Sequence, residues 1–460
     1  MPVTERRREI FGSRLGLLVT TVGAAVGLGN VWRFPYMTGR FGGAAFVAVY
    51  LAVVVAVGIP ALAAEWTLGR RTGRGPVGAF ARGGLPGGRA VGWVLFAGVA
   101  AATAYYTSAI GWVALHGLGQ LVVAAGGDES ALAGWLAGGA GRPPGAAILP
   151  PETGLDPRSL GLQLLGTVGL AAAAAVVLRR GLRRGIERAS RILVPLLFGT
   201  LALLIVRSVT LPGAGEGVAW YLLSFEASDL TPGVVLGALG QAIFSLGLGG
   251  TFMVVYGSHM APDEPLPADA AWTAAGDTVA GLLAGFAVFP AVFALGLEPA
   301  AGPELIFRTL PRVFAELPGG GWWGALFFLA LAGAAFLSDL AAFRVLAAGL
   351  EDGAGLERER ATTIVAVLVV VLAVPPMLNL KIFVPWDLAF GSGLQTFGAL
   401  VAAVTVGWAL DRGAALEELA SGAGAGPEAA RLRLLHLWIR WVVPAAVLAA
   451  GGWWAVTEVL

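Results

Sequence analysis

The chain alternates between long hydrophobic runs and short polar segments along its whole length. A helix needs about 20 mostly apolar residues to cross a bilayer, and eleven runs approach or exceed that length. They cover approximately residues 13–38, 42–68, 90–124, 160–178, 190–211, 233–258, 270–297, 321–349, 361–379, 383–410 and 434–458. The pattern predicts an all-α integral membrane protein with about 11 transmembrane helices, built as a single domain over residues 1–460.

The polar segments differ in charge, and the difference predicts the orientation of the chain. Arginines gather in alternate connections: Arg6, Arg7 and Arg8 before the first run, Arg70, Arg71, Arg74 and Arg82 after the second, and Arg179, Arg180, Arg183, Arg184 and Arg188 between the fourth and fifth. Basic residues near span ends stay in the cytoplasm, so the N-terminus is predicted to be cytoplasmic, and eleven crossings place the C-terminus outside. The connection 261–268 falls on the cytoplasmic side although it is acidic, but acidic residues contribute little to this rule.

Composition narrows the class of protein further. Hydrophobic residues make up 57% of the chain and charged residues 13%, against about 25% charged residues in soluble domains. The mean hydropathy is +0.79. These values exclude a disordered chain, a nucleic-acid binder and an ordinary soluble globule. The chain has no cysteine, and its three histidines lie far apart, so no thiolate site or nucleophile–base pair supports an enzyme. A lipid bilayer is the expected surrounding, and the oligomeric state stays open.

Two connections between runs are long. Residues 125–160 are rich in Gly and Pro, and residues 297–320 contain an amphipathic stretch at 303–317. This stretch predicts either a re-entrant or surface helix over an extracellular vestibule or a plain surface loop.

Two of the hydrophobic runs contain glycine clusters and polar residues in their middle. The cluster in the first run extends from Gly23 to Asn30, and the cluster in the sixth run from Gln241 to Gly250. Each Gly costs about 1 kcal/mol relative to Ala inside a helix, so both segments are predicted to unwind. Unwound backbone in a membrane must be buried or line a cavity. There its carbonyl groups can bind a cation, and a half-helix N-terminus can bind a carboxylate.

Glycine clusters also permit close packing of continuous helices, and that explanation fits either cluster alone. The two together favour unwinding, because they fall in runs one and six. Five helices is an odd number, so a second set of five has inverted topology. Interrupted helices at matching positions of two inverted halves are typical of secondary transporters. The first five-helix repeat is predicted over residues 13–211, the second over 233–410, and an additional helix over 434–458.

The residues around these clusters resemble the neurotransmitter:sodium symporter family, in particular its bacterial amino-acid transporters. The N-terminal motif over residues 13–35 ends in AVGLGNVWRFP and continues through 42–46 and 58–60 to Glu65 and Trp66. Further similarity lies at Tyr105, Tyr106, 241–249, 284–290, Glu351, Asp352 and Asp387. The resemblance covers runs one to ten. It implies two inverted-topology five-helix repeats with interrupted helices 1 and 6, and sodium-coupled transport by alternating access.

The resemblance implies a first sodium site built from oxygen donors, which suit a hard cation. Its ligands would be the Ala25 carbonyl and the side chains of Asn30, Ser245 and Asp277. A carboxylate such as Asp277 is costly at membrane depth and is usually functional there.

The resemblance also implies a second sodium site, formed by carbonyl groups of Gly23, Val26 and Ala334 and by the hydroxyl of Ser338. Leu337 occupies a position at which relatives usually carry Thr, Ser or Asp, and Asp339 follows Ser338. Either the register shifts by one residue, or this site loses a ligand.

The substrate is expected between the two breaks. Tyr106 would donate its hydroxyl to a substrate carboxylate, together with backbone amides near Leu28 and Gly29. Gly27 occupies the position at which amine transporters of the family carry Asp, which favours a substrate with its own carboxylate. Small residues at Gly250 and Ala342 predict a roomy pocket. The expected pocket residues are Ala25, Leu28, Gly29, Ala102, Tyr106, Phe244, Gly247, Gly250, Ser338 and Ala342.

Two charged pairs are expected to close the site. Arg33 with Asp387 would form an outer gate, and Arg8 with Asp352 an inner one. Arg8 also belongs to an arginine run that sets topology, and the two interpretations are similarly supported. Glu65 is expected to hydrogen-bond to unwound backbone.

We therefore predict a symporter that takes up a hydrophobic or aromatic amino acid with one or two Na+ ions across the plasma membrane of a prokaryote. Tyr50, Gln241 and Ser245 match the chloride neighbourhood of animal family members, but chloride is not expected to be required, because Asp277 can contact sodium and neutralise its charge. Two alternatives stay open. One is a proton-coupled transporter in which Asp277, Asp339 or Glu65 carries the proton, and the other is a non-transporting amino-acid sensor or a channel.

Overall fold

The computed structural model describes residues 9–127, 148–299, 310–315, 318–422 and 429–454, and also residues 134, 424, 426 and 456. These residues form helices and connecting turns, and no strand occurs among them. Nine of their helices are long and apolar enough to cross a membrane, and one bent pair provides a tenth span. The sixth hydrophobic run forms two helices that are each too short to cross alone. The prediction of an all-α membrane protein with about 11 spans is confirmed.

The first five spans come from the first half of the chain. They are formed by α1 (Arg14–Ala25) with η1 (Gly29–Arg33) and α2 (Phe34–Arg40), α3 (Ala44–Val53) with η2 (Val54–Gly58) and α4 (Ile59–Thr72), α6 (Gly88–Ala124), α8 (Pro157–Arg179), and η3 (Leu182–Glu187) with α9 (Arg188–Val209). Two short helices, α5 (Pro76–Arg82) and α10 (Ala214–Leu222), lie in connections.

The remaining spans follow in the second half. They are formed by α11 (Pro232–Ser245) with α12 (Phe252–Gly257), α13 (Leu266–Ala294), α15 (Gly320–Ala354), α16 (Arg358–Leu378), α17 (Leu380–Trp386) with η6 (Asp387–Gly393), α18 (Leu394–Val404) and η7 (Thr405–Ala409), and α20 (Ala430–Leu437) with η8 (Trp438–Val442) and α21 (Val443–Trp454). The connections contain η4 (Ala227–Asp229), α14 (Leu310–Ala315) and α19 (Arg412–Ala420).

Local chemistry fixes several helix boundaries. Ser13 Oγ accepts a hydrogen bond from the Gly16 amide at 3.1 Å and so caps α1. The Asp156 side chain caps α8 in the same way. Gly73, with φ of 60°, ends α4 in the left-handed conformation that glycine adopts without strain. The helices α6 and α15 have 37 and 35 residues, more than a bilayer needs, so both extend beyond the hydrocarbon region.

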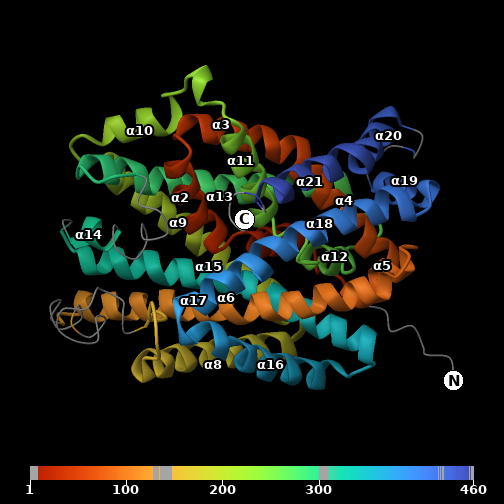
Figure 1. The fold of residues 1–460 in the computed structure, drawn as a ribbon, viewed down its shortest axis with the longest axis horizontal. Coiled ribbons are helices and arrows are strands. Elements are labelled where there is room, and N and C mark those ends of the chain that lie inside the picture. Colours follow the sequence, from red (N-terminus) through yellow and green to blue (C-terminus); the bar gives the residue numbers. More distant parts are fainter. Residues whose placement is uncertain are drawn as a thin grey trace.

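The long helices run roughly parallel to the long axis of the molecule (Figure 1). On one side, α6 packs against α8, α15 and α16. On the other side, α13 packs against α9 and α10, and α3 packs against α11. The first broken span lies between these groups, where α1 contacts α9, α13 and α15. In the second broken span, α11 packs against α3 and α12 packs against α4. The interrupted segments are therefore surrounded by protein.

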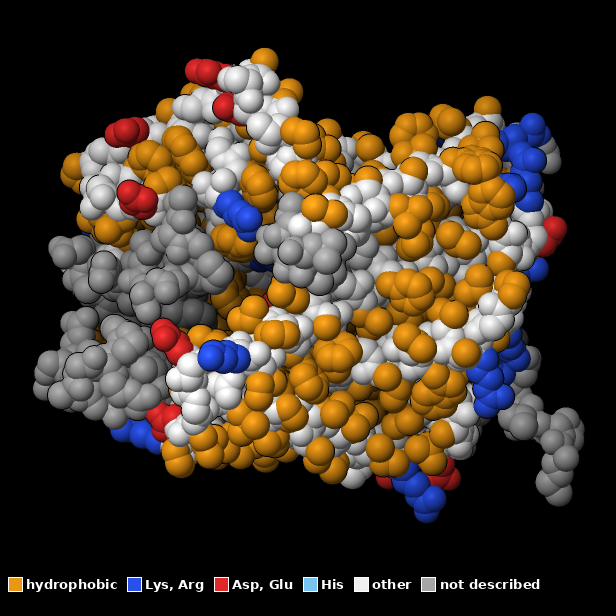
Figure 2. Space-filling model, viewed as in Figure 1, with side chains coloured by type: hydrophobic (Ala, Val, Ile, Leu, Met, Phe, Trp, Pro, Cys, Tyr) orange, Lys and Arg blue, Asp and Glu red, His pale blue; other side chains and the backbone are white. Residues whose placement is uncertain are grey.

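The surface divides into a hydrophobic middle and two charged ends. Figure 2 shows hydrophobic side chains over most of the middle of the visible face. The larger clusters of Lys and Arg on this face lie at the end that carries α5, α19 and the N-terminus, whereas Asp and Glu are frequent near α10. This distribution agrees with a cytoplasmic N-terminus.

The two long connections are described only in part. Within the amphipathic stretch 303–317, α14 buries Leu310, Val313 and Phe314 in a cluster that includes residues of α13 and α15. This packing supports a helix for these six residues rather than a plain loop. Most of the connection 125–160 lies outside the described residues.

Candidate cation and substrate site

The first break separates α1 from η1 and α2. Val26 is extended, with φ of −74° and ψ of 116°, and the helical parts on either side differ in direction by 54°. A Cβ added to Gly27 would lie 2.6 Å from the Tyr106 hydroxyl oxygen and 2.7 Å from Ser338 Oγ. Glycine is needed here because two side chains of other helices approach the backbone closely.

The second break lies between α11 and α12, at residues 246–251. Gly247 and Gly249 have φ of 62° and 79°, and Thr251, with φ of 57°, is the one non-glycine residue with positive φ in the described part of the chain. The Gly249 amide donates a hydrogen bond to Glu65 Oε1 at 2.6 Å. Glu65 is buried, so it satisfies unwound backbone as the sequence predicted.

Three polar side chains from different spans meet beside the first break. Asn30 Nδ2 donates hydrogen bonds to Ser245 Oγ at 2.9 Å and to Asp277 Oδ1 at 2.7 Å. Ser245 Oγ in turn donates to Asp277 Oδ2 at 2.8 Å. All three residues are at most 1% exposed. The structure therefore brings together the side chains predicted for the first sodium site.

This cluster offers oxygen atoms suited to a hard cation. The Asp277 backbone carbonyl also accepts from Asn30 Nδ2 at 2.9 Å, so three oxygens converge on that one donor group. Asn30 Oδ1 accepts from the Gly27 amide at 3.1 Å. Ala25 is the last residue of α1, where carbonyl groups lack intrahelical partners. Oxygen ligands of this kind bind Na+ or similar hard ions, so Ser245, Asp277 and the Ala25 carbonyl fit the implied cation. The Asn30 side chain would join them as a ligand with its amide group turned, so that Oδ1 rather than Nδ2 faces Ser245 and Asp277.

The predicted substrate residues lie around the same break. The Leu28 amide donates to the Tyr106 hydroxyl at 3.4 Å, and a Cβ added to Gly29 would lie 3.1 Å from the Phe244 ring. The side chains of several residues at the centre of the bundle are partly exposed, namely Ala102, Tyr106, Phe244 and Ser338. Partly exposed side chains of three helices therefore meet at the first break, where the Leu28 amide and the Tyr106 hydroxyl lie together.

Phe252 is a residue of this region that sequence reasoning missed. A Cβ added to Gly250 would overlap the Phe252 ring, and Ala342 is only 4% exposed. The space left by Gly250 is thus taken up by the aromatic ring two residues later. The side chain of Phe252 could not be placed from sequence, because its direction depends on the left-handed conformation of Thr251.

The second predicted sodium site contains hydrocarbon where an oxygen is expected. Ser338 Oγ donates to the Val26 carbonyl at 3.3 Å. A Cβ added to Gly23 would lie 2.9 Å from Leu337 Cδ1, and both Leu337 and Ala334 are buried. The register is not shifted, since Leu337 and Ser338 are the residues that face the first broken helix.

Asp339 points to a different neighbour. Its Oδ1 accepts from Thr107 Oγ1 of α6 at 2.8 Å. Asp339 is fully buried, and its Oδ2 has no hydrogen-bond partner among the residues that the structure describes. Asp339 therefore faces α6 rather than the residues predicted for the second sodium site.

The predicted outer pair lies above the substrate residues. The Arg33 guanidinium lies over the Phe244 ring, 4.4 Å from its centroid, and interacts electrostatically with Asp387. Asp387 accepts a hydrogen bond from Tyr105, which sequence analysis had matched to the family without giving it a role.

The predicted inner pair is described only in part. Arg8 lies outside the described residues, and Asp352 accepts from the Gly75 amide and forms an ion pair with Arg74 at 3.6 Å. Glu9, missed by the sequence analysis, accepts from the amides of Leu182 and Arg183 at 3.0 and 3.2 Å. The N-terminal arm is therefore attached to the connection between α8 and α9.

Further contacts hold this arm, defined as residues 9–13. The Phe11 amide donates to the His259 carbonyl at 3.2 Å, and the Gly12 amide donates to Glu187 Oε2 at 3.1 Å. Partial burial opposes ionisation of Glu9, but hydrogen bonds from the two amides and the charges of Arg358 and Arg183 hold its pKa below the ordinary value. Glu9 is thus a carboxylate at neutral pH, and the arm joins the connection between α8 and α9 to the segment after α12.

Comparison with known proteins gives consistent matches over most of the chain. The sequence profile described as the Sodium:neurotransmitter symporter family matches residues 8–121 and 158–440. The sodium-dependent transporter YhdH of Bacillus subtilis (strain 168) is 30% identical over 461 residues, which cover 97% of each chain. The sodium-dependent serotonin transporter of Drosophila melanogaster is 27% identical over 370 residues, which cover 72% of this chain and 57% of the relative.

A solved structure matches at the level of the fold. The crystal structure of MhsT in complex with L-phenylalanine superposes with a TM-score of 0.82 at 33% sequence identity. The match covers 96% of this chain and 99% of MhsT.

Removing an oxygen from the Asn30–Ser245–Asp277 cluster is expected to weaken sodium binding. Asn30→Ala and Ser245→Ala each remove one candidate ligand, and a ligand worth about 1–3 kcal/mol corresponds to roughly 5- to 150-fold in affinity. The measurement is the sodium concentration that gives half-maximal substrate binding. Thr20→Ala, which removes a buried hydroxyl of α1 outside the cluster, serves as control. Unchanged sodium dependence in both site variants would contradict the assignment.

Restoring an oxygen at Leu337 is expected to strengthen the second site. Leu337→Ser adds a hydroxyl facing Gly23, so the dependence of binding on sodium concentration should become steeper. Leu337→Ala opens similar space without the oxygen and should not have this effect. If the two variants gave the same curve, the loss of a ligand at Leu337 would not explain the properties of this site.

Proposed function

Because the chain belongs to the sodium:neurotransmitter symporter family, we propose that it carries a hydrophobic or aromatic amino acid across the membrane together with sodium. This proposal rests on the position of the candidate carboxylate-binding groups next to the candidate cation site. The Tyr106 hydroxyl and the Leu28 amide lie beside the Asn30–Ser245–Asp277 cluster, at the break of the first span. A carboxylate bound at the break would thus lie next to a cation.

The chemistry of the break favours an amino acid with its own carboxylate. Gly27 has no side chain, and even a Cβ would crowd Tyr106 and Ser338, so the protein supplies no acid there to bind a substrate amine. The rings of Phe244 and Phe252 flank the nearby backbone and would pack well against an apolar or aromatic side chain. The complex of MhsT with L-phenylalanine supports the same class of substrate.

Different residues would bind the ion and the substrate. The side chains of Asn30, Ser245 and Asp277, with the Ala25 carbonyl, would hold a sodium ion, which supplies positive charge beside the substrate carboxylate. Tyr106 orients that carboxylate by donating its hydroxyl. Arg33, stacked on Phe244, and Asp387 cover the site from one side, while the arm at Glu9 closes the opposite end. If only one of these two closures opens at a time, the site is exposed to one side of the membrane at a time, which is alternating access.

We also propose that the protein lies in a prokaryotic plasma membrane with its N-terminus in the cytoplasm. The arginine-rich connections that follow α4 and α8 support this orientation. The bacterial origin of the relatives from Bacillus subtilis and Haemophilus influenzae supports the membrane.

Uptake into proteoliposomes is the direct test of this function. Labelled phenylalanine, tryptophan and leucine should accumulate against their gradients when sodium is outside, and much less when choline replaces sodium at a fixed pH gradient. Gly27→Ala should abolish uptake, because its Cβ would lie 2.6 Å from the Tyr106 hydroxyl oxygen. Gly240→Ala, where nothing lies within 4 Å of an added Cβ, should retain it. Accumulation driven by a pH gradient in choline would instead favour proton coupling, and binding without accumulation a sensor.

The position of Asp277 predicts that transport does not need chloride. Tyr50 and Ser245 both donate to Asp277 Oδ2, at 3.5 and 2.8 Å, so the carboxylate already engages hydroxyls that match the chloride neighbourhood of animal relatives. Sodium-driven uptake should be unchanged when gluconate replaces chloride. Asp277→Asn should become inactive or chloride-dependent, whereas Asp263→Asn, at an exposed carboxylate, should not. Strong chloride dependence of the unmodified protein would show that Asp277 does not substitute for the anion.

A further inference from the structure

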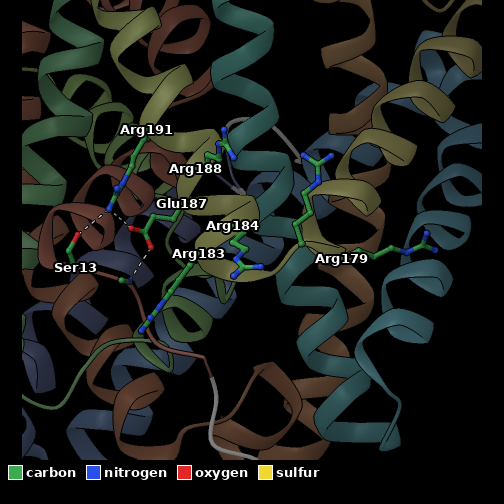
Figure 3. A pocket seen from close by; sticks show the side chains of 9 residues that line it. Ser13, Arg179, Arg183, Arg184, Glu187, Arg188 and Arg191 are labelled. Carbon is green, nitrogen blue, oxygen red and sulfur yellow. Dashed lines mark hydrogen bonds and ion pairs between the residues drawn. The ribbon is translucent and has the colours of Figure 1, made fainter.

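A basic pocket lies where the N-terminal arm meets the connection between α8 and α9. It has a volume of about 940 Å³ and is lined by Gly12, Ser13, Arg179, Arg180, Arg183, Arg184, Glu187, Arg188 and Arg191. Figure 3 shows Ser13, Glu187 and Arg191 joined by hydrogen bonds at one side of this pocket. The proposed sodium and substrate site does not use any of these residues.

Half of the arginines in this pocket are already engaged. Arg191 donates to Glu187 at 2.5 Å, Arg183 donates to the Ile10 carbonyl at 2.9 Å, and Arg179 donates to Thr363 at 2.9 Å. The other three, Arg180, Arg184 and Arg188, form no hydrogen bond or ion pair with any residue of the described chain. All three are exposed, so their guanidinium groups are available to a ligand.

The charge of this region is strongly unbalanced. Six arginines and one carboxylate, Glu187, line the pocket, and Glu187 is already bound by Arg191 and by the Gly12 amide. The nearby Glu9 carboxylate is bound by the Leu182 and Arg183 amides and pairs with Arg358. The adjoining residues 1–8 contain Glu5 but also Arg6, Arg7 and Arg8. That segment is therefore itself positive and cannot neutralise the pocket. An external anion would complement this excess of positive charge.

Exposed apolar side chains lie near the arginines of the pocket on both α8 and α9. Arg188, Ile192 and Leu196 are spaced four residues apart on α9 and so share one face. Ile192 and Leu196 are 60% and 47% exposed, and Val176, one turn before Arg179 and Arg180 on α8, is 48% exposed. Exposed apolar side chains on membrane-spanning helices suit contact with lipid chains, so an anion bound by the arginines would have apolar side chains one turn away on each helix.

We propose that this pocket binds the phosphate headgroup of an anionic phospholipid. Guanidinium groups donate paired hydrogen bonds to phosphate oxygens, and basic pockets between spans on the cytoplasmic side recognise acidic headgroups. The lipid's acyl chains would lie against Val176, Ile192 and Leu196. Gly12 and Ser13 belong to the arm, so a bound headgroup would also hold the arm in its docked position.

The proposal differs from a purely topological role of the arginines. A topological role depends on the number of positive charges near the span ends, and any of them can be exchanged for another. A headgroup site depends on the residues that line the pocket. Arg89 and Arg412 are exposed arginines that do not line it, and they provide a control with the same change in charge.

The test uses the full-length protein in detergent, without sodium or substrate, so its outcome is independent of the proposed transport. Native mass spectrometry would compare retention of phosphatidylglycerol and phosphatidylcholine. The unmodified protein should retain phosphatidylglycerol preferentially, and Arg184→Gln with Arg188→Gln should lose about 5-fold in affinity for each arginine removed. Arg89→Gln with Arg412→Gln should bind as the unmodified protein does. The single variants Arg184→Gln and Arg188→Gln replace the double variant if it does not fold.

Three results would overturn the proposal. Equal retention of the two lipids would show that the headgroup charge is not recognised. An equal loss of affinity for phosphatidylglycerol in the pocket variants and in the control variants would show that binding responds to net charge alone. Displacement of phosphatidylglycerol by inorganic phosphate at equal concentration would show a site for free phosphate rather than for lipid.

Discussion

The architecture depends on one constraint, which is that unwound backbone inside a membrane must find hydrogen-bond partners within the protein. Buried side chains meet this constraint at both breaks. Glu65 accepts from the Gly249 amide, Asn30 Oδ1 accepts from the Gly27 amide, and Gln241 Nε2 donates to the Gly29 carbonyl at 2.9 Å. The same side chains fix the positions of the oxygen and nitrogen atoms that remain for ligands. Stability of the interrupted helices and binding of ion and substrate therefore share one set of residues.

The two ends of the site are closed by different chemistry. On one side, the Arg33 side chain stacks on an aromatic ring and interacts with the Asp387 side chain. On the other side, Glu9 and Glu187 accept from backbone amides of segments far apart in sequence. A side-chain pair can separate by small rotamer changes, whereas the arm must leave as a unit. The two closures therefore differ in how much structure moves when each one opens.

Sequence predicted the features that depend on local composition and on an ordered motif. Hydrophobic runs gave the spans, and the glycine clusters gave both breaks, which the structure contains. The convergence of Asn30, Ser245 and Asp277 followed from the resemblance, since no periodicity places residues 30, 245 and 277 together. Phe252 and Glu9 were missed for physical reasons. The ring of Phe252 is directed by a left-handed residue, Thr251, and Glu9 finds its partners at Leu182 and Arg183 only once the chain is folded.

Leu337 has a thermodynamic consequence for a transporter of this design. One positive charge that crosses with a neutral substrate contributes about 2.3 kcal/mol for each 100 mV of membrane potential, which is about 50-fold in the accumulation ratio at equilibrium. Two ions per cycle would square this factor. Leu337 places a methyl group, and not an oxygen, close to Gly23. If this lowers the number of sodium ions carried per cycle, it also lowers the substrate gradient that the cell can maintain. A transporter that carries one ion per cycle reaches a lower accumulation ratio but takes up each substrate molecule at the cost of fewer ions.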